Sequence, residues 1–257
     1  MIKPTGLILW EGPSRLNKEE IVVVGILESA NVKTGNLIQT FIMPKNVDPI
    51  TAINSGYDEC VCGSCLLKGR IIESYRGNYL GIHHKTTKNI GRVCYVRVDW
   101  VVNQAWNKYK SGGYPKYNYH QHSKLFKGRK IRLGAYGDPL AVPLKIWQRY
   151  LKLCNGHTGY SKQWPNYRNN HYKNYVQASV FNEQEKIFAN KVGFHTFRIK
   201  NKNDKNSLPG EITCPASINE KITCEKCMQC SGQKRNVVID VHGSIAKVAN
   251  FNRVLLK

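Results

Sequence analysis

The fold is decided in the stretch Lys130–Pro139, which reads Lys-Ile-Arg-Leu-Gly-Ala-Tyr-Gly-Asp-Pro. Its apolar and β-branched residues predict a strand over Lys130–Tyr136, and Gly137 with Pro139 marks the end of that strand. An apolar pattern of helical period continues through about Leu153, which predicts an amphipathic helix with a broad buried face. A strand followed at once by such a helix is the repeating unit of parallel α/β folds.

The same alternation continues toward the C-terminus. Further strands are predicted at residues 156–161, 175–180, 194–199, 211–214 and 237–242. A helix is predicted between the second and third of these strands, because Asn182 and Glu185 form a capping pattern and Gly193 supplies a stop. We therefore predict an α/β fold with parallel strands, a (β/α) barrel-like sheet that is either closed or a partial barrel. A doubly wound open sheet is the alternative.

The 257 residues are expected to form a single domain in three parts. Residues 1–99 contain predicted strands, one of them at 92–98, and a first group of cysteines. Residues 100–130 form a loop-like insertion that is basic and aromatic. Residues 131–257 carry the β/α repeats and a second group of cysteines.

The strongest chemical signal is a run of three cysteines at two-residue intervals, preceded by a remote cysteine that is followed by proline. This pattern is typical of proteins that bind an iron–sulfur cluster. The predicted ligands of a cluster, of [4Fe–4S] type, are Cys214, Cys224, Cys227 and Cys230. Structural zinc is the alternative, although it more commonly uses separated cysteine pairs.

The first group of cysteines predicts a second metal site. Its three ligands are Cys62, Cys65 and Cys94. Cys60 is a possible fourth ligand; without it, one position on the metal stays open for substrate or solvent. The alternatives are a structural zinc, or a second cluster completed by a histidine such as His83 or His84.

Polar residues at the predicted strand ends are candidate catalytic groups, because parallel α/β folds place their chemistry there. Asp138 is the one acidic residue between positions 100 and 182, a stretch with fourteen Lys and Arg. It is a candidate base or cation anchor, and its alternative role is a helix N-cap before proline. His157, Tyr160 and His242 are candidate proton donors or acceptors, with structural roles as the alternative. Cys214 also falls at a strand end, which places the predicted cluster near the same face.

The net charge of +22 favours a polyanionic partner, either nucleic acid or a phosphorylated ligand. A solvated basic face is the alternative. The segment Trp106–Arg132 interleaves six aromatic with eight basic residues and has no acid, which suits single-stranded nucleic acid. The candidate nucleic-acid-binding residues are Lys108, Lys110, Lys127, Arg129 and Lys130.

A cytoplasmic location is expected, with no membrane partner. No apolar run reaches the ~18 residues that a membrane helix requires, and the first residues lack a secretory signal pattern. Cytoplasmic thiols remain reduced, so metal ligation is the usual explanation for nine cysteines.

Several motifs, in order, resemble a family of uncharacterised bacteriophage and plasmid proteins, and the likeness spans nearly the whole chain. The motifs are Leu7–Ser14, Cys62-Gly63-Ser64-Cys65, Cys94-Tyr95-Val96, Arg132–Pro139, Gly156–Trp164 and Cys214-Pro215-Ala216-Ser217 with Cys224, Cys227, Cys230 and Gly232. The resemblance implies a phage origin, and hence the cytoplasm of a host cell. It also implies a first site of three cysteines, because the family usually lacks the equivalent of Cys60. It brings no activity with it.

A strand–helix barrel with cysteine clusters is also distantly similar to radical S-adenosylmethionine enzymes. Their Cys-x-x-x-Cys-x-x-Cys motif is absent from this sequence, and Gly137-Asp138-Pro139 only faintly resembles their methionine-binding loop. We expect an iron–sulfur protein that serves electron transfer, with a redox partner, or substrate activation. The alternative is a zinc-stabilised nucleic-acid-binding protein in phage replication or DNA metabolism.

Overall fold

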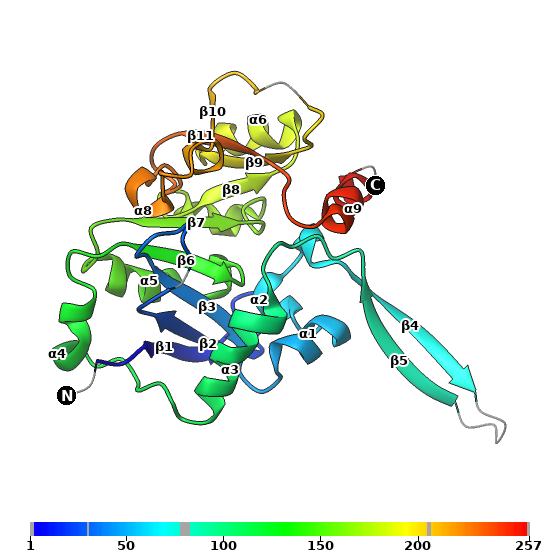
Figure 1. Cartoon of the computed structure of the whole chain (residues 1–257), viewed down its shortest axis with the longest axis horizontal. Helices are drawn as coiled ribbons and strands as arrows, with labels where there is room; N and C mark the ends of the chain where they lie inside the picture. Colours follow the sequence, from blue (N-terminus) through cyan, green and yellow to red (C-terminus); the bar gives the residue numbers. More distant parts are fainter. Residues whose placement is uncertain (1–2, 30, 78–82, 205–206, 256–257) are drawn as a thin grey trace.

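The computed structural model describes residues 3–29, 31–77, 83–204 and 207–255 and shows an α/β protein (Figure 1). Its centre is a nine-stranded mixed sheet in the order β1-β2-β3-β6-β7-β8-β9-β11-β10. The strands are β1 (Gly6–Pro13), β2 (Glu20–Ile26), β3 (Ile38–Pro44), β6 (Ile131–Tyr136), β7 (His157–Ser161), β8 (Gln177–Val180), β9 (Thr196–Lys200), β10 (Glu211–Thr213) and β11 (Asn236–Asp240).

The first three strands form an antiparallel meander, and every later pairing in this sheet is parallel. The α/β class and the parallel core are thus confirmed. Among the described residues the sheet runs from β1 at one edge to β10 at the other, so it is open and not a closed barrel. The antiparallel meander places β2 and β1 beyond β3, at the edge opposite β10.

Helices and single turns cover the sheet and connect its strands. The α-helices are α1 (Pro49–Ser55), α2 (Glu59–Cys62), α3 (Asn103–Lys110), α4 (Tyr119–His122), α5 (Leu144–Leu151), α6 (Glu183–Lys191), α7 (Pro215–Ile218), α8 (Cys224–Cys227) and α9 (Ile245–Leu255). Shorter turns are the 3-10 helices η1 (Leu66–Lys68), η3 (Ser123–Leu125), η4 (Pro139–Ala141) and η5 (Tyr167–Tyr172) and the π-helix η2 (Val98–Val102).

The predicted helix after Pro139 is confirmed as α5, which buries Ile146, Trp147 and Tyr150 in the main apolar core. The predicted cap of α6 is also confirmed, since the side chain of Asn182 accepts a hydrogen bond from the backbone N–H of Glu185 at 2.8 Å.

A second apolar cluster covers the β8–β9–β11 part of the sheet and reaches both groups of cysteines. It contains buried Phe181, Phe197, Val237 and Cys230, with Cys65, Cys94 and Cys214 among the half-buried residues packed against it. The two groups therefore border one apolar region of the fold, although they come from opposite ends of the sequence.

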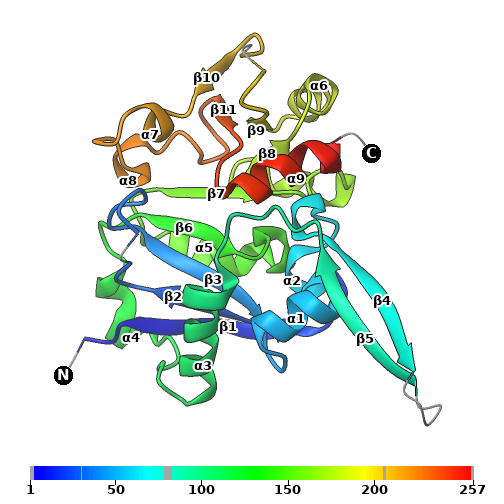
Figure 2. The ribbon, with the colours of Figure 1, turned by 45° about the vertical axis from the view of Figure 1, so that its right-hand side comes forward.

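A two-stranded hairpin projects from the body of the protein, formed by β4 (Arg70–Gly77) and β5 (His83–Ile90) (Figures 1 and 2). The sequence pattern predicts no strand at the hairpin, and the predicted strand at 92–98 is wrong. Residues 92–97 have no strand pairing, and the backbone N–H groups of Val93 and Cys94 both donate to the carbonyl of Leu67, at 3.1 and 2.8 Å. The chain then enters η2.

The segment 100–130 is more regular than the predicted loop, because it contains α3, α4 and η3. Several of its aromatic rings pack into the core. Phe126 packs on Tyr150 at 5.3 Å between ring centroids, and Tyr117 packs on Tyr150 at 5.0 Å. Among the residues searched, no helix is long and apolar enough to span a membrane.

Candidate metal centre

The C-terminal cysteine group (Cys214, Cys224, Cys227 and Cys230) is assembled from two turns of helix. Cys214 follows β10 and caps α7, which has proline at its first position. Cys224 and Cys227 are the first and last residues of α8, and residues three apart lie on one face of a helix. Met228 then takes a left-handed conformation with φ 50°, which reverses the chain before Cys230.

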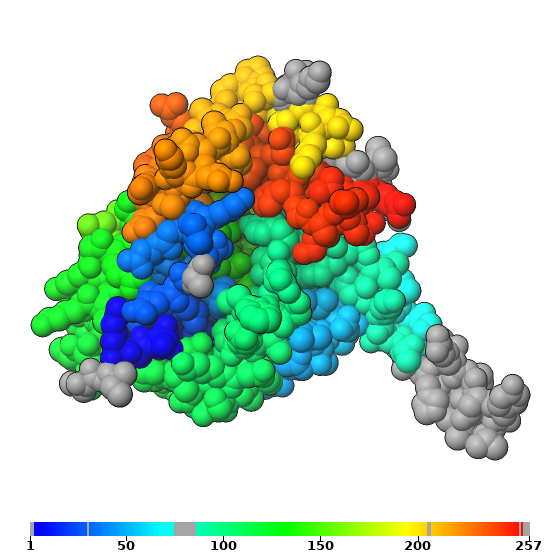
Figure 3. Space-filling view, viewed as in Figure 1, coloured from blue at the N-terminus to red at the C-terminus, as the bar shows by residue number. Residues whose placement is uncertain are grey.

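The loop that carries α8 is fixed on the turn between β2 and β3. The backbone N–H of Cys224 donates to the carbonyl of Lys33 at 3.0 Å, and Lys130 Nζ donates to the carbonyl of Glu225 at 2.6 Å. In the space-filling view the loop that carries α8 (orange) and the turn between β2 and β3 (blue) lie side by side (Figure 3). The loop is thus held by contacts with distant strands as well as by its own turns.

The end of this loop is tied to β7. The backbone N–H of Gly159 donates to the carbonyl of Cys230 at 3.0 Å. The Nε2 atom of His157 lies 2.9 Å from the carbonyl of Ser231, and burial lowers the pKa of this histidine. The structure therefore places the candidate catalytic His157 at the start of β7, where it supports the cysteine loop, and not at the strand end with Tyr160.

The four thiols lie within electrostatic reach of one another. Burial raises the pKa of Cys214 and Cys224 and raises that of Cys230 to about 12, and neighbouring thiols of the group add to each shift. A bound cation relieves this repulsion, because metals bind the thiolate form.

Two kinds of hydrogen bond oppose the effect of burial. The backbone N–H groups of Ala216 and Ser217 lower the pKa of Cys214, and the hydroxyl of Tyr160 lowers the pKa of Cys230. Hydrogen bonds to cysteine sulfur stabilise its negative charge and tune the potential of a cluster bound there.

All nine cysteines are free thiols. Within the described part of the chain, no three Cys, His, Asp or Glu side chains converge closely enough to bind a metal ion as they stand. The donor chemistry of the C-terminal cysteine group fits a cluster: four thiols on neighbouring turns, hydrogen bonds that lower the pKa of Cys214 and Cys230, and the nearby cation of Arg132, which lowers the pKa of Cys224.

The N-terminal cysteine group (Cys62, Cys65 and Cys94) is held by α2 and the segment that follows it. Cys62 ends α2, and the backbone N–H of Cys65 donates to the Cys62 carbonyl at 3.2 Å. The side-chain amide of Gln163, just after β7, donates to the same carbonyl at 3.1 Å. This group therefore lies at the carboxyl end of β7.

Burial raises the pKa of Cys62 well above its ordinary value, and Asp58, Cys65 and Cys94 raise it further while Arg92 lowers it. Burial likewise raises the pKa of Cys65 to about 11. The three thiols thus interact with one another, as the thiols of the C-terminal cysteine group do.

Cys60 is separated from this group. It is fully buried in the main core, and burial with the nearby charge of Asp58 raises its pKa to about 12. The side chains of His83 and His84 lie outside the described part of the structure.

Tyr95, Arg132 and Tyr160 connect the two cysteine groups. Arg132 donates from Nη2 to the hydroxyl of Tyr95 at 3.1 Å, and its guanidinium carbon lies 5.7 Å from the centre of the Tyr160 ring. Tyr95 follows Cys94 directly, and Tyr160 hydrogen-bonds Cys230. The candidate residue His242 lies at the rim of this set, with its ring 5.3 Å from that of Tyr95.

Asp138 is the N-cap of η4, which is the alternative role predicted for it from the sequence. Its Oδ1 accepts hydrogen bonds from the backbone N–H of Leu140 at 2.9 Å and from the hydroxyl of Ser161 at 2.8 Å. Its Oδ2 accepts from the backbone N–H of Lys162 at 2.8 Å. Burial nevertheless raises its pKa to about 6.

We expect the raised pKa of Asp138 to give the fold a measurable pH dependence. A carboxyl whose pKa rises from 3.8 to about 6 on folding stabilises the protein below about pH 4, and this stabilisation is lost as the pH rises through 6. Urea unfolding between pH 4 and 6.5 should show the free energy of unfolding falling by about 2 kcal/mol from this group.

In the Asp138→Asn variant the free energy of unfolding should fall less between pH 4 and 6.5. Some of the fall should remain, because burial also raises the pKa of Asp58 to about 6. Asp99→Asn is the matched control, since Asp99 is exposed. Parallel curves for the wild type and Asp138→Asn would contradict the prediction.

Three residues of this region were missed by sequence reasoning: Tyr95, Arg132 and Lys162. The ammonium of Lys162 donates to the carbonyl of Ser179 at 3.0 Å. Burial lowers the pKa of Lys162 to about 7, although the charge of Cys65 acts to raise it. Its signal in the sequence is its position directly after the predicted strand at 156–161. Arg132 gives a weaker signal, as a cation inside an otherwise apolar strand.

The five candidate nucleic-acid-binding residues are divided between two places. Lys108 and Lys110 lie on α3 and pack over the rings of Tyr114 and Trp106, at 5.2 and 5.5 Å from the ring centres. The other three, Lys127, Arg129 and Lys130, precede β6. There Arg129 Nη2 donates to the carbonyl of Leu27, and Lys130 holds the cysteine loop as described.

Comparisons of the chain with models of protein families, with curated proteins and with solved structures gave no match. The family resemblance of the motifs therefore stays a prediction.

Proposed function

We propose that this protein binds an iron–sulfur cluster, of [4Fe–4S] type, through Cys214, Cys224, Cys227 and Cys230. The observation that supports the proposal is that two neighbouring turns, α7 and α8, carry thiols that raise one another's pKa, together with that of Cys230. Such a cluster would supply one-electron transfer or activation of a substrate.

The chain's own residues would tune this centre. The guanidinium of Arg132 places positive charge beside Cys224, and the hydroxyl of Tyr160 donates to the sulfur of Cys230. Both stabilise negative charge on sulfur and so favour the reduced state of a cluster. The second apolar cluster around Cys230 limits access of water.

The N-terminal cysteine group would hold a second metal, either zinc or a further cluster. Its three thiols leave one coordination position for a substrate atom or water. We place it at the carboxyl ends of the strands, where an open sheet acting as a partial barrel offers its site. Lys162, whose ammonium donates to the carbonyl of Ser179 and feels the charges of Cys65 and Asp138, would move a proton there.

A cytoplasmic location is supported by the nine free thiols, which an oxidising compartment would pair. The motif resemblance adds a phage origin and hence a host cell. In such a setting a soluble reductant or a redox protein would deliver the electrons.

The alternative, a zinc-stabilised nucleic-acid-binding protein, has less support in the arrangement of the insertion. Tyr114 and Phe126 are buried in the core. Trp106 donates a hydrogen bond from Nε1 to the carbonyl of Pro44 at 2.9 Å, and the hydroxyl of Tyr109 donates one to the carboxylate of Glu11. Of the aromatic residues between 106 and 132, Tyr119 is the one that is largely exposed. A single exposed ring offers little surface for stacked bases.

Anaerobic purification with iron, sulfide and zinc analysis tests the proposal. About four iron and four sulfide per chain, or about eight if both groups hold clusters, with a broad absorption band near ~400 nm, is the expected result. Zinc without sulfide would overturn it, and binding of single-stranded DNA that weakens steeply with salt would then support the alternative.

A further inference from the structure

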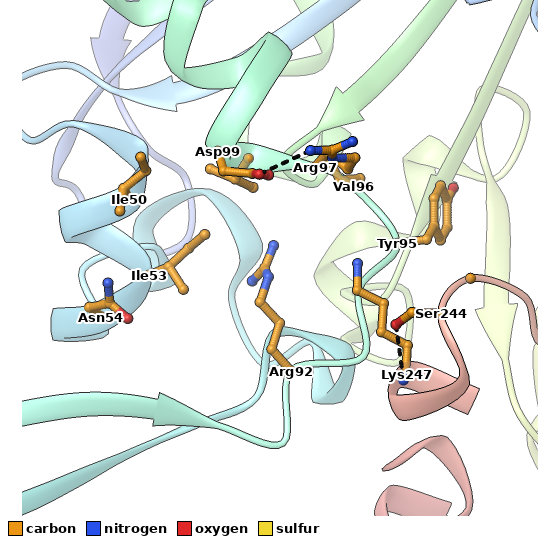
Figure 4. A pocket seen from close by; sticks show the side chains of 12 residues that line it. Ile50, Ile53, Asn54, Arg92, Tyr95, Val96, Arg97, Asp99, Ser244 and Lys247 are labelled. Carbon is orange, nitrogen blue, oxygen red and sulfur yellow. Dashed lines mark hydrogen bonds and ion pairs between the residues drawn. The ribbon is translucent and has the colours of Figure 1, made fainter. Parts of the chain in front are cut away.

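A pocket of about 550 Å³ opens between α1, residues 92–99 and the start of α9 (Figure 4). It lies outside the C-terminal cysteine group, and its volume is in the usual range for small-molecule sites, ~300–1,000 Å³. Figure 4 shows Ile50, Ile53 and Asn54 on one side, with Ser244 and Lys247 on the other and Arg92 between them. The pocket is therefore chemically different at its two ends.

One end of the pocket is cationic. Arg92 has a side chain only 17% exposed, and its Nη2 atom is buried with no hydrogen-bond partner among the described residues. Its salt-bridge contact, Nη1 to Asp58 Oδ2, is 3.7 Å long. Nη1 already donates to the carbonyl of Lys68 at 3.4 Å, so an anion that reached Nη2 would give that atom the acceptor it lacks, since buried polar groups are normally bonded.

Lys247 and the first turn of α9 add to the positive end. Lys247 Nζ donates to the carbonyl of Cys94 at 2.8 Å and keeps two further protons for bonding. Ser244 caps α9, whose N-terminal dipole also favours an anion. Asp99 is the acid in the lining, and it is paired with Arg97 at 3.3 Å. Asp58 partly offsets the charge of Arg92, so Lys247 gives this end its excess of positive charge.

The other end of the pocket is apolar with one polar group. Ile50 and Ile53 come from successive turns of α1, and Val96 and Val98 complete the lining from the opposite segment. Asn54 is exposed beside them, and its amide offers one donor and one acceptor. Flat heterocyclic rings need this combination of apolar faces and a bonding edge.

From these two ends we infer that the pocket binds a mononucleotide, with the phosphate between Arg92 and Lys247 and the base beside Ile50, Ile53 and Asn54. This inference goes beyond the proposed cluster and does not depend on it, because no cysteine side chain lines the pocket. A nucleotide bound here lies next to Cys94 and Tyr95, at the edge of the N-terminal cysteine group.

Isothermal titration of the purified full chain with adenosine monophosphate, adenosine and inorganic phosphate tests the inference. The nucleotide should bind at least about tenfold more tightly than either fragment, because only it uses both ends of the pocket. Equal affinity for the nucleotide and inorganic phosphate would show an adventitious anion only. Equal affinity for the nucleotide and adenosine, or no binding, would also overturn the inference.

Two variants locate the binding. Lys247→Gln should weaken nucleotide binding about tenfold by removing one charged donor, whereas Lys145→Gln, the same change at an exposed site on α5, should not. Asn54→Leu lies on an exposed helix surface and should weaken the nucleotide several-fold while leaving inorganic phosphate unchanged. Iron and sulfide content, measured on the same samples, separates failure of this inference from failure of the proposed function.

Discussion

Replacement of Cys227 by alanine is expected to remove the proposed cluster from the C-terminal cysteine group. Cys227 closes α8, and its thiol interacts with those of Cys214, Cys224 and Cys230. With three thiolates left, a four-iron cluster loses one of its iron anchors and is either lost or converted to a smaller form. Iron and sulfide analysis after anaerobic purification should show loss of most of the iron that this group holds.

Cys154→Ala is the matched control for this experiment. Cys154 is half-buried against the main core after α5, and burial raises its pKa to about 12, with no other thiol contributing to the shift. Its removal deletes a small apolar group and should cost stability of about 1 kcal/mol, with metal content unchanged. Full iron content and an unchanged spectrum in the Cys227→Ala protein would show that the ligand set is wrong.

A third variant, Cys62→Ala, separates the two groups. Cys62 belongs to the N-terminal cysteine group. Burial raises its pKa most, and the thiols that raise it further, Cys65 and Cys94, belong to the same group. Its replacement should therefore remove the metal proposed for the N-terminal cysteine group and leave the absorption spectrum of the C-terminal cysteine group unchanged. Coupled loss from both groups would instead indicate that they hold one shared assembly.

The parallel part of the fold was predictable because its signals are local. The strand Ile131–Tyr136 and the helix Leu144–Leu151 each carry their own apolar period, and Asn182 with Glu185 caps the next helix within four residues. Periodicity, caps and turn residues are set by neighbours along the chain. Closure of the sheet into a barrel is different, because it depends on the order and pairing of all nine strands together. No single segment of the sequence determines it.

The errors occur where non-local contacts decide the backbone. The alternation in Arg92–Val98 predicts a strand, but Val93 and Cys94 both donate to Leu67, and residues 92–97 pair with no strand in the described part of the chain. The β4–β5 hairpin projects from the body, and most of its residues are polar: β4 reads Arg-Ile-Ile-Glu-Ser-Tyr-Arg-Gly and β5 reads His-His-Lys-Thr-Thr-Lys-Asn-Ile. It therefore lacks the apolar alternation that marks a half-buried strand.

The candidate site shows the same division. Cysteine spacing alone grouped Cys224 with Cys227 and Cys230, because two-residue intervals are meaningful within one loop. Spacing carries no information on Arg132 and Tyr95, which meet at 3.1 Å from positions 37 residues apart. The role of Cys60 was also beyond spacing: it lies two residues before Cys62 and faces the main core.

The second large effect is expected from Gly232→Ala, in the loop that returns from Cys230 to β11. Gly232 has φ 86°, a conformation that favours glycine, and an added Cβ would lie 2.8 Å from the carbonyl oxygen of Lys173 and 2.8 Å from the nitrogen of Val176. These are backbone atoms that cannot rotate away. Left-handed strain and this overlap together should cost about 3 kcal/mol in the free energy of unfolding.

Gly112→Ala isolates the contribution of crowding. Gly112 has a similar φ of 74°, but no atom of the described chain lies within 4 Å of its added Cβ. This variant should therefore lose only the strain of the left-handed conformation, about 1 kcal/mol. Urea unfolding of both variants measures the difference, and equal losses would refute the crowding argument.

The same pair of variants tests whether the loop positions the cysteines. Relief of the overlap at Gly232 would move the chain away from Val176. The same movement would draw Cys230 away from Gly159, whose backbone N–H donates to the carbonyl of Cys230 at 3.0 Å. Gly232→Ala should then lower iron content as well as stability, whereas Gly112→Ala should keep the metal. If Gly232→Ala were unstable yet fully loaded, the cluster would not depend on the loop's position, and the four thiols would be able to gather around iron without the support of β7.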